Sequence, residues 1–361
     1  MAAHIYAASP NGPRGSGGLT FEELRQSENG IWCCYDHGKV IDSGGGSVFS
    51  AAQLKAWKRL HEMRKGVEIH GLAPDRFGLV ESITINSAPV LSGSTFELGM
   101  LNFVIGANGT GKTVLGRLLR SVSDLNYVAH LSRSQEVDVA VKWFDPHSHE
   151  VSTSGRSGEL RQTLDGRRVP YVARPYKTIM PTDFHAQSWS LISLAQQFDL
   201  SVTAMASTLR ALPDSSRIVR EVTVTDSAVE MVVVHKGRTF QVGERGWWDH
   251  GPLDLLVFLE LVSTHAAHHA RDEPTLLILD ELFARYNSET RFAALGQVEA
   301  TAEHVQIAVL THNAANPQAF GQGWTVTRLP DYSPGDRANA GRPIDLEITA
   351  TNRPAPARST I

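Results

Sequence analysis

The residues that decide the fold are Asn102–Thr113, with the sequence NFVIGANGTGKT. An apolar run that is typical of a buried strand leads into a glycine-rich turn ending in lysine and threonine. Gly106 to Thr113 follow the spacing G-x-x-x-x-G-K-[ST], and the amphipathic run Val114–Leu125 after them predicts a helix. Because the full motif lies between a strand and a helix, it predicts a phosphate-binding loop.

Each residue type in this loop has a chemical reason. Glycines permit positive φ angles, so that successive backbone N–H groups can point toward one phosphate at the start of the following helix. Lys112 is predicted to reach the β- and γ-phosphates, and the Thr113 hydroxyl is predicted to bind Mg²⁺. The expected nucleotide-binding residues are Gly106, Asn108, Gly109, Thr110, Gly111, Lys112, Thr113 and Val114.

Composition narrows the class of protein. The chain has 361 residues, 42% of them apolar, and a formal net charge of −4 at pH 7. This apolar content suffices for a large α/β core, and the charge argues against coating of nucleic acid by the whole surface. The only two cysteines, Cys33 and Cys34, are adjacent, which favours neither a disulfide framework nor a zinc site. No stretch reads as a signal peptide or a membrane span, so we expect a soluble, cytoplasmic protein without a membrane partner.

Shifts in composition predict four segments. Residues 1–19 are rich in Gly, Pro and Ser and are predicted to be disordered. Residues 20–72 are predicted to form an N-terminal appendage of unknown role. Residues 73–330 alternate strand and helix patterns and are predicted to form the nucleotide-binding domain. Residues 331–361 are predicted to be an extension with a Pro-rich tail.

The appendage carries three local signals. Thr20 and Glu23 have the spacing of a helix capping box. Residues 31–41, around Asp36-His37-Gly38, are predicted to form a short hairpin. Ala51–Lys65, preceded by Ser50, is predicted to be a helix with many basic residues. This helix could contact nucleic acid or a partner protein, and a simple solvated face is the alternative.

A second group of polar residues follows two apolar runs. Leu276–Glu281, with the sequence LLILDE, predicts a buried parallel strand that ends in two carboxylates. Asp280 suits the outer ligand shell of Mg²⁺, and Glu281 suits polarisation of an attacking water. The run Gln306–Leu310 predicts another strand, after which His312 could donate to the γ-phosphate; a core or surface histidine is the alternative.

The order of these motifs resembles a known family. A hairpin, a P-loop, an apolar strand with Asp-Glu and a strand that ends in His are similar to the ABC-type ATPase heads of the structural-maintenance-of-chromosomes (SMC), RecF-like and overcoming-lysogenization-defect-like families, over about Phe77–Leu329. The resemblance implies an α/β P-loop NTPase fold, with a mixed sheet, helices and an antiparallel β subdomain. It assigns Walker A to Lys112 and Thr113, Walker B to Asp280, the catalytic glutamate to Glu281 and the switch histidine to His312.

Three further assignments rest on weaker matches to the same family. Asn287 lies where the family has the aspartate of its D-loop. Gly251, before a mostly apolar helix, is assigned to the signature that contacts the γ-phosphate of a partner's ATP. Gln187 is assigned to the Q-loop and to Mg²⁺, with Gln135 as the competing choice.

The resemblance also implies a role. It implies Mg²⁺-dependent ATP hydrolysis by a head-to-tail homodimer or higher oligomer, which acts as the motor or switch of a bacterial antiviral-defence or DNA-repair complex. The chain between Lys112 and Asp280 is too short for a long coiled-coil arm, and the effector, for example a nuclease, is expected on another chain. Direct contact with DNA or RNA stays open. The alternative is an ATP-binding scaffold without turnover; Glu281 and His312 argue against a small-molecule kinase.

Overall fold

The computed structural model describes residues 2–350 apart from 10, 70–77, 123, 146, 170–171, 173–174, 182–189, 199, 226–228, 243–251, 271–272, 283–286, 303–304, 313–322 and 331–346. The chain forms two compact units, Met1–Phe77 and Gly78–Ile361. The shift in composition predicts this division after residue 72. Among the described helices, none combines the length and the apolarity that crossing a bilayer takes.

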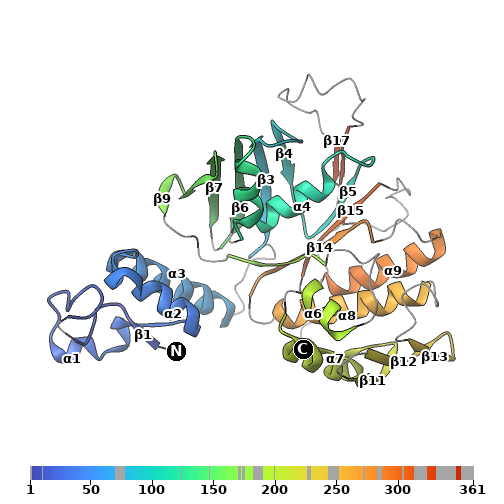
Figure 1. Ribbon diagram of the computed structural model, residues 1–361, viewed down its shortest axis with the longest axis horizontal. Coiled ribbons are helices and arrows are strands. Elements are labelled where there is room, and N and C mark those ends of the chain that lie inside the picture. Colours follow the sequence, from blue (N-terminus) through green and yellow to red (C-terminus); the bar gives the residue numbers. More distant parts are fainter. Residues whose placement is uncertain are drawn as a thin grey trace. The chain divides into compact units, whose positions relative to one another are not determined.

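The first unit consists of helices and a short two-stranded sheet (Figure 1). Strands β1 and β2 pair antiparallel. The capping box of Thr20 and Glu23 is present at the start of helix α1, and Ser50 Oγ accepts from the backbone N–H of Gln53 in the first turn of α3. The elements are β1 (Ala2–His4), α1 (Phe21–Leu24), η1 (Ser27–Asn29), β2 (Gly30–Trp32), α2 (Tyr35–Asp42), η2 (Ser43–Gly46) and α3 (Ala51–Ile69).

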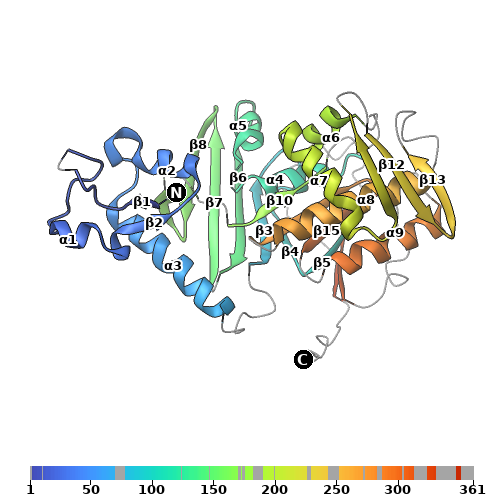
Figure 2. The same cartoon turned by 90° about the horizontal axis from the view of Figure 1, so that it is seen from below.

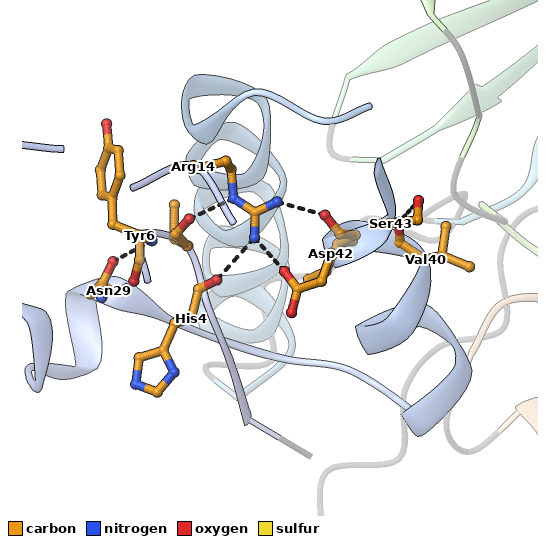
Figure 3. Close-up of polar contacts among 9 residues, drawn as sticks. His4, Tyr6, Arg14, Asn29, Val40, Asp42 and Ser43 are labelled. Carbon is orange, nitrogen blue, oxygen red and sulfur yellow. Dashed lines mark hydrogen bonds and ion pairs between the residues drawn. The ribbon is translucent and has the colours of Figure 1, made fainter. Parts of the chain in front are cut away.

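Two expectations for this unit differ from the structure. Residues 1–19 were predicted to be disordered, yet they contain β1 and the buried side chain of Arg14 (Figure 3). Arg14 donates to the carbonyl oxygens of Ile5 (2.6 Å) and Ile41 (2.5 Å) and pairs with Asp42 Oδ1 (2.6 Å). The hydrogen bonds and the ion pair of this one arginine hold the segment to the rest of the unit, and a composition rich in Gly and Pro does not reveal them.

The predicted hairpin over residues 31–41 is wrong, because Tyr35–Asp42 form helix α2. Cys34 is the N-cap residue of this helix, and its sulfur accepts from the backbone N–H of His37 at 3.5 Å. Cysteine is not a usual capping residue, so the local sequence gave no start signal for a helix.

The second unit is built on a mostly parallel sheet with the strand order β10-β14-β15-β5-β16-β17. The strands described in this sheet pair in parallel, except that β17 runs antiparallel to its neighbour, β16. The strand before the glycine-rich turn, β5, lies between β15 and β16. The bounds are β5 (Leu101–Ile105), β10 (Lys177–Ile179), β14 (Thr275–Asp280), β15 (Gln306–Thr311), β16 (Trp324–Arg328) and β17 (Glu347–Ala350).

An antiparallel sheet, in the order β4-β3-β6-β7-β8-β9, forms a second layer. The side chain of Gln306 joins the two sheets: its amide donates to the carbonyl oxygens of Val80 and Gly99, both at 2.8 Å, and its oxygen accepts from Val80 N at 2.9 Å. The elements of this layer are β3 (Val80–Ser87), β4 (Ser94–Glu97), α4 (Lys112–Arg120), α5 (Asn126–Ser132), β6 (Val137–Phe144), β7 (Ser148–Arg156), β8 (Glu159–Leu164) and β9 (Arg167–Val169).

The other face of the parallel sheet is covered by helices and a three-stranded sheet (Figure 2). This layer holds α6 (Leu191–Gln197), α7 (Val202–Ser215), β11 (Val219–Val224), β12 (Val229–His235), β13 (Arg238–Val242), α8 (Pro252–Ala270) and α9 (Ser288–Thr301). Successive side chains of β14 point to opposite faces of the sheet and so belong to two hydrophobic cores. Leu277 and Leu279 lie in the core with the helices α6 to α9, whereas Leu276 and Ile278 lie in the core around α4. The predicted fold class, an α/β P-loop NTPase with an antiparallel β subdomain, is confirmed.

Candidate nucleotide site

The glycine-rich turn has the conformation that its sequence predicts. After β5 ends at Ile105, Gly109 has φ 87° and Gly111, the N-cap of α4, has φ 100°. Both angles lie in the left-handed region that favours glycine. A Cβ atom on Gly106 would lie 2.5 Å from Thr110 Oγ1, so this position is also restricted by close packing. The loop therefore brings backbone N–H groups to the start of α4, where an anion is favoured.

The turn between β3 and β4 packs against this loop. A Cβ atom on Gly111 would lie 2.8 Å from Val90 Cγ2 and 3.0 Å from the Cγ atom of Leu91. Leu91 is fully buried and itself has a positive φ of 64°. The predicted hairpin before the P-loop thus fixes the loop from one side.

Lys112 lies at the centre of the site with 5% of its side chain exposed. Its ammonium donates to the carbonyl oxygens of Gly106 (2.7 Å) and Ala107 (2.9 Å) in the same loop. It also forms an ion pair with Glu281 Oε1, at 3.0 Å. The two halves of the predicted site, far apart in sequence, therefore meet at this lysine.

Thr113 and Asp280 form the second contact between the two halves. Thr113 Oγ1 donates to Asp280 Oδ2 at 2.6 Å. Burial raises the pKa of Asp280, the Thr113 hydrogen bond opposes that shift and the neighbouring Glu281 adds to it. Arg117, four residues after Thr113 on α4, also lowers this pKa by its charge. Arg117 was not among the predicted site residues, although its i, i+4 spacing from Thr113 was a usable signal.

These two residues fit a magnesium ion. The other oxygen of the carboxylate, Asp280 Oδ1, is buried and has no hydrogen-bond partner among the described residues. A hard cation beside a carboxylate and a hydroxyl would satisfy that oxygen. Within the described part of the chain, no group of three or more His, Cys, Asp or Glu side chains is arranged to hold a metal. Mg²⁺ at Thr113 and Asp280 would therefore take most of its ligands from phosphate and water, as this ion commonly does.

Glu281 and His312 follow two neighbouring strands. β14 and β15 pair in parallel, with Asp280 opposite Leu310, so the residues after them lie at the same edge of the sheet. Glu281 has a positive φ of 53°, and its N–H donates to Leu310 O at 2.9 Å. Its Oε2 atom contacts His312 Nδ1 at 2.7 Å and accepts from the backbone N–H of His312 at 3.3 Å.

Comparison with protein-family models gives no match, and comparison with curated proteins gives none either. Solved structures do match. The chain is similar to SMC heads and RecF. Three examples are the SMC head domain from Thermotoga maritima (13% identity, 76% of this chain and 99% of that one, TM-score 0.44), the Pyrococcus furiosus SMC head with an extended coiled coil bound to the C-terminal domain of ScpA (10%, 75% and 96%, 0.47), and the recombination mediator RecF-ATPrS of the RecFOR pathway (10%, 70% and 96%, 0.45).

Three weaker sequence assignments stay predictions. Gly251 and Gln187 lie outside the described residues. Asn287 is the N-cap of α9, where its Oδ1 accepts from Thr290 N at 2.9 Å. This capping role explains an asparagine at that position without a nucleotide. Its contact with a nucleotide stays a prediction.

Proposed function

We propose that this chain binds ATP together with Mg²⁺ and hydrolyses it. The observation that carries this proposal is the meeting of Lys112 and Thr113, from the P-loop, with Asp280, the last residue of β14, and Glu281, which follows it. These side chains lie at the carboxyl edge of a parallel sheet, beside the start of a helix, which is where α/β proteins bind phosphate ligands.

The roles of these residues follow from their charges. The backbone N–H groups of the loop and Lys112 bind the phosphates, and Thr113 with Asp280 holds Mg²⁺, which supplies neutralisation of the β- and γ-phosphate charge. Glu281 is then the base for water, held in place by His312 Nδ1 at 2.7 Å. Separate carboxylates serve the metal and the water, because a carboxylate that binds a metal is a poor base.

The biological role is proposed from the motif order that resembles SMC and RecF-like heads. In this proposal two copies bind two ATP molecules head to tail, and closure of the dimer drives an effector on another chain in antiviral defence or DNA repair. Gly251 is the residue proposed to contact the partner's γ-phosphate.

The decisive experiment is steady-state ATP hydrolysis by wild type and Glu281→Gln with Mg²⁺. The variant is expected to bind ATP but to lose turnover by about 100-fold or more, since an amide cannot accept the proton of water. Light scattering is expected to show that this variant stays dimeric with ATP. Glu230→Gln, on the exposed side of β12, is the matched control. Hydrolysis near the wild-type rate in Glu281→Gln would exclude Glu281 as the base. ATP binding by the wild type without turnover would favour the scaffold alternative.

A further inference from the structure

Three oxygens of the described residues lie around Lys112 Nζ. The ammonium donates hydrogen bonds to Gly106 O and Ala107 O, at 2.7 and 2.9 Å, and forms an ion pair with Glu281 Oε1, at 3.0 Å, an oxygen without a hydrogen-bond partner among the described residues. A phosphate that binds to Lys112 on the side of this ion pair has to replace the carboxylate.

Of the three oxygens, that of Glu281 is the one that can leave. Gly106 O and Ala107 O belong to the backbone of the loop, whose shape is fixed by its glycines and by contact with the β3–β4 turn. The carboxylate of Glu281 lies on a side chain that can rotate and is 24% exposed. A phosphate also carries the same sign of charge as this carboxylate. The two anions repel each other, so keeping both beside one ammonium costs electrostatic free energy.

Glu281 keeps an anchor when it leaves Lys112. Its backbone N–H is bonded to Leu310 O, and its other oxygen contacts His312 Nδ1 at 2.7 Å. The displaced carboxylate oxygen is then the free one, on a group still held at the sheet edge. Displacement from Lys112 thus produces a carboxylate with an oxygen available for water.

We propose that Glu281 determines nucleotide affinity, because its carboxylate competes with the phosphates for Lys112. Phosphate binding then releases this carboxylate from the lysine, so that it can act as the base for water. This inference rests on the proposed function, and it adds a role in binding to the role in turnover. The ion pair keeps Lys112 neutralised until a phosphate takes its place, so the base becomes available only when the substrate is bound.

The test is the affinity of ADP, measured by calorimetry with Mg²⁺ for wild type, Glu281→Gln and Glu281→Asp. ADP is used because its binding is not confounded by turnover. Aspartate keeps the negative charge and tolerates the positive φ, but its side chain is shorter by about 1.5 Å and no longer reaches Lys112. Both variants are expected to bind ADP about tenfold tighter than wild type, because a charge-assisted contact no longer has to be broken. An increase in affinity of at least about threefold is needed to support the proposal. Glu230→Gln is expected to bind like wild type.

The outcomes separate three explanations. Tighter binding by Glu281→Gln alone would show a general repulsion between carboxylate and phosphate and would overturn the competition for Lys112. Unchanged affinity in both variants, with wild-type melting curves, would overturn it as well. If a variant is unfolded, addition of free phosphate to wild type decides, because competition predicts that inorganic phosphate increases the reactivity of the Glu281 carboxylate toward a carbodiimide. Absence of nucleotide binding by the wild type would contradict the proposed function itself.

Discussion

Lys112 places a positive charge among backbone groups, where only 5% of its side chain is exposed. Lys112→Ala is expected to weaken ATP binding by about 100-fold, because the phosphates lose a charge-assisted contact with a buried ammonium. Calorimetry measures the change. Lys142→Ala, which removes an exposed lysine paired with Glu150 on the antiparallel sheet, is the control and is expected to bind normally. Affinity within a few-fold of wild type in Lys112→Ala would contradict the P-loop assignment.

Two glycines of the loop offer a matched comparison. Gly109 and Gly111 both have positive φ, but a Cβ on Gly109 meets no atom within 4 Å, whereas one on Gly111 meets Val90 at 2.8 Å. Gly109→Ala is expected to reduce the free energy of unfolding by about 1 kcal/mol, for backbone strain alone. Gly111→Ala adds the displacement of Val90 and Leu91 and is expected to cost about 2 kcal/mol or more. Urea unfolding measures the free energy of unfolding of both variants and shows whether Gly111→Ala loses more than Gly109→Ala. Equal losses would show that the β3–β4 turn adjusts freely.

At the scale of an element, helix α8 carries a histidine that burial keeps neutral. Burial, together with nearby positive charge from His269 and Lys177, lowers the pKa of His265 to about 3. The ring lies edge-on to Phe198, with centroids 5.2 Å apart. Because the unfolded chain binds this proton near pH 6.5 and the folded chain does not, the contribution of His265 to stability is present above pH 6.5 and is lost as the pH falls toward 3.

The lowered pKa of His265 predicts that the free energy of unfolding decreases measurably as the pH falls. Between pH 7.5 and 5.5, His265 is expected to reduce the free energy of unfolding by about 1.4 kcal/mol. His265→Gln lacks the titrating group, so the loss between the two pH values is expected to be smaller by that amount in the variant than in wild type. Urea unfolding at both pH values measures the difference, and His268→Gln, on the exposed side of the same helix, serves as the control. Equal losses in wild type and His265→Gln would show that the ring is protonated in the folded protein.

Features that a short stretch of sequence encodes could be predicted, whereas contacts between distant segments could not. The strand, glycine turn and helix around Lys112 are encoded within one short motif, and the apolar run before Asp280 has the length of a buried strand, so both were predicted. Helix α2 was missed because Cys34 is an unusual cap. The ion pair of Lys112 with Glu281 arises only from the packing of strands distant in sequence, and no local pattern could reveal it. The left-handed backbone of Glu281 has the same origin.

At the scale of the whole molecule, the two units make separate predictions. Arg14→Ala is expected to destabilise the first unit by about 3 kcal/mol, because the carbonyl oxygens of Ile5 and Ile41 and the carboxylate of Asp42 lose one shared donor. Hydrogen exchange is expected to rise in β1 and α2, while ATP affinity is expected to stay unchanged. Arg25→Ala, which removes an exposed guanidinium 5.6 Å from the ring of Phe21, is the control. A loss of ATP affinity in Arg14→Ala would show that the site depends on the first unit.

The position of β5 between β15 and β16 has a consequence for how the protein is made. The side chain of Asn102 in β5 bonds to the backbone of Ile307, 205 residues further along the chain. On a ribosome, the P-loop strand therefore emerges long before either of its neighbours has been translated. Throughout that interval its apolar side chains and both of its edges await partners, which is the condition that recruits chaperones to a nascent chain. A transcript truncated before the codons of β15 would yield the P-loop sequence without a functional site.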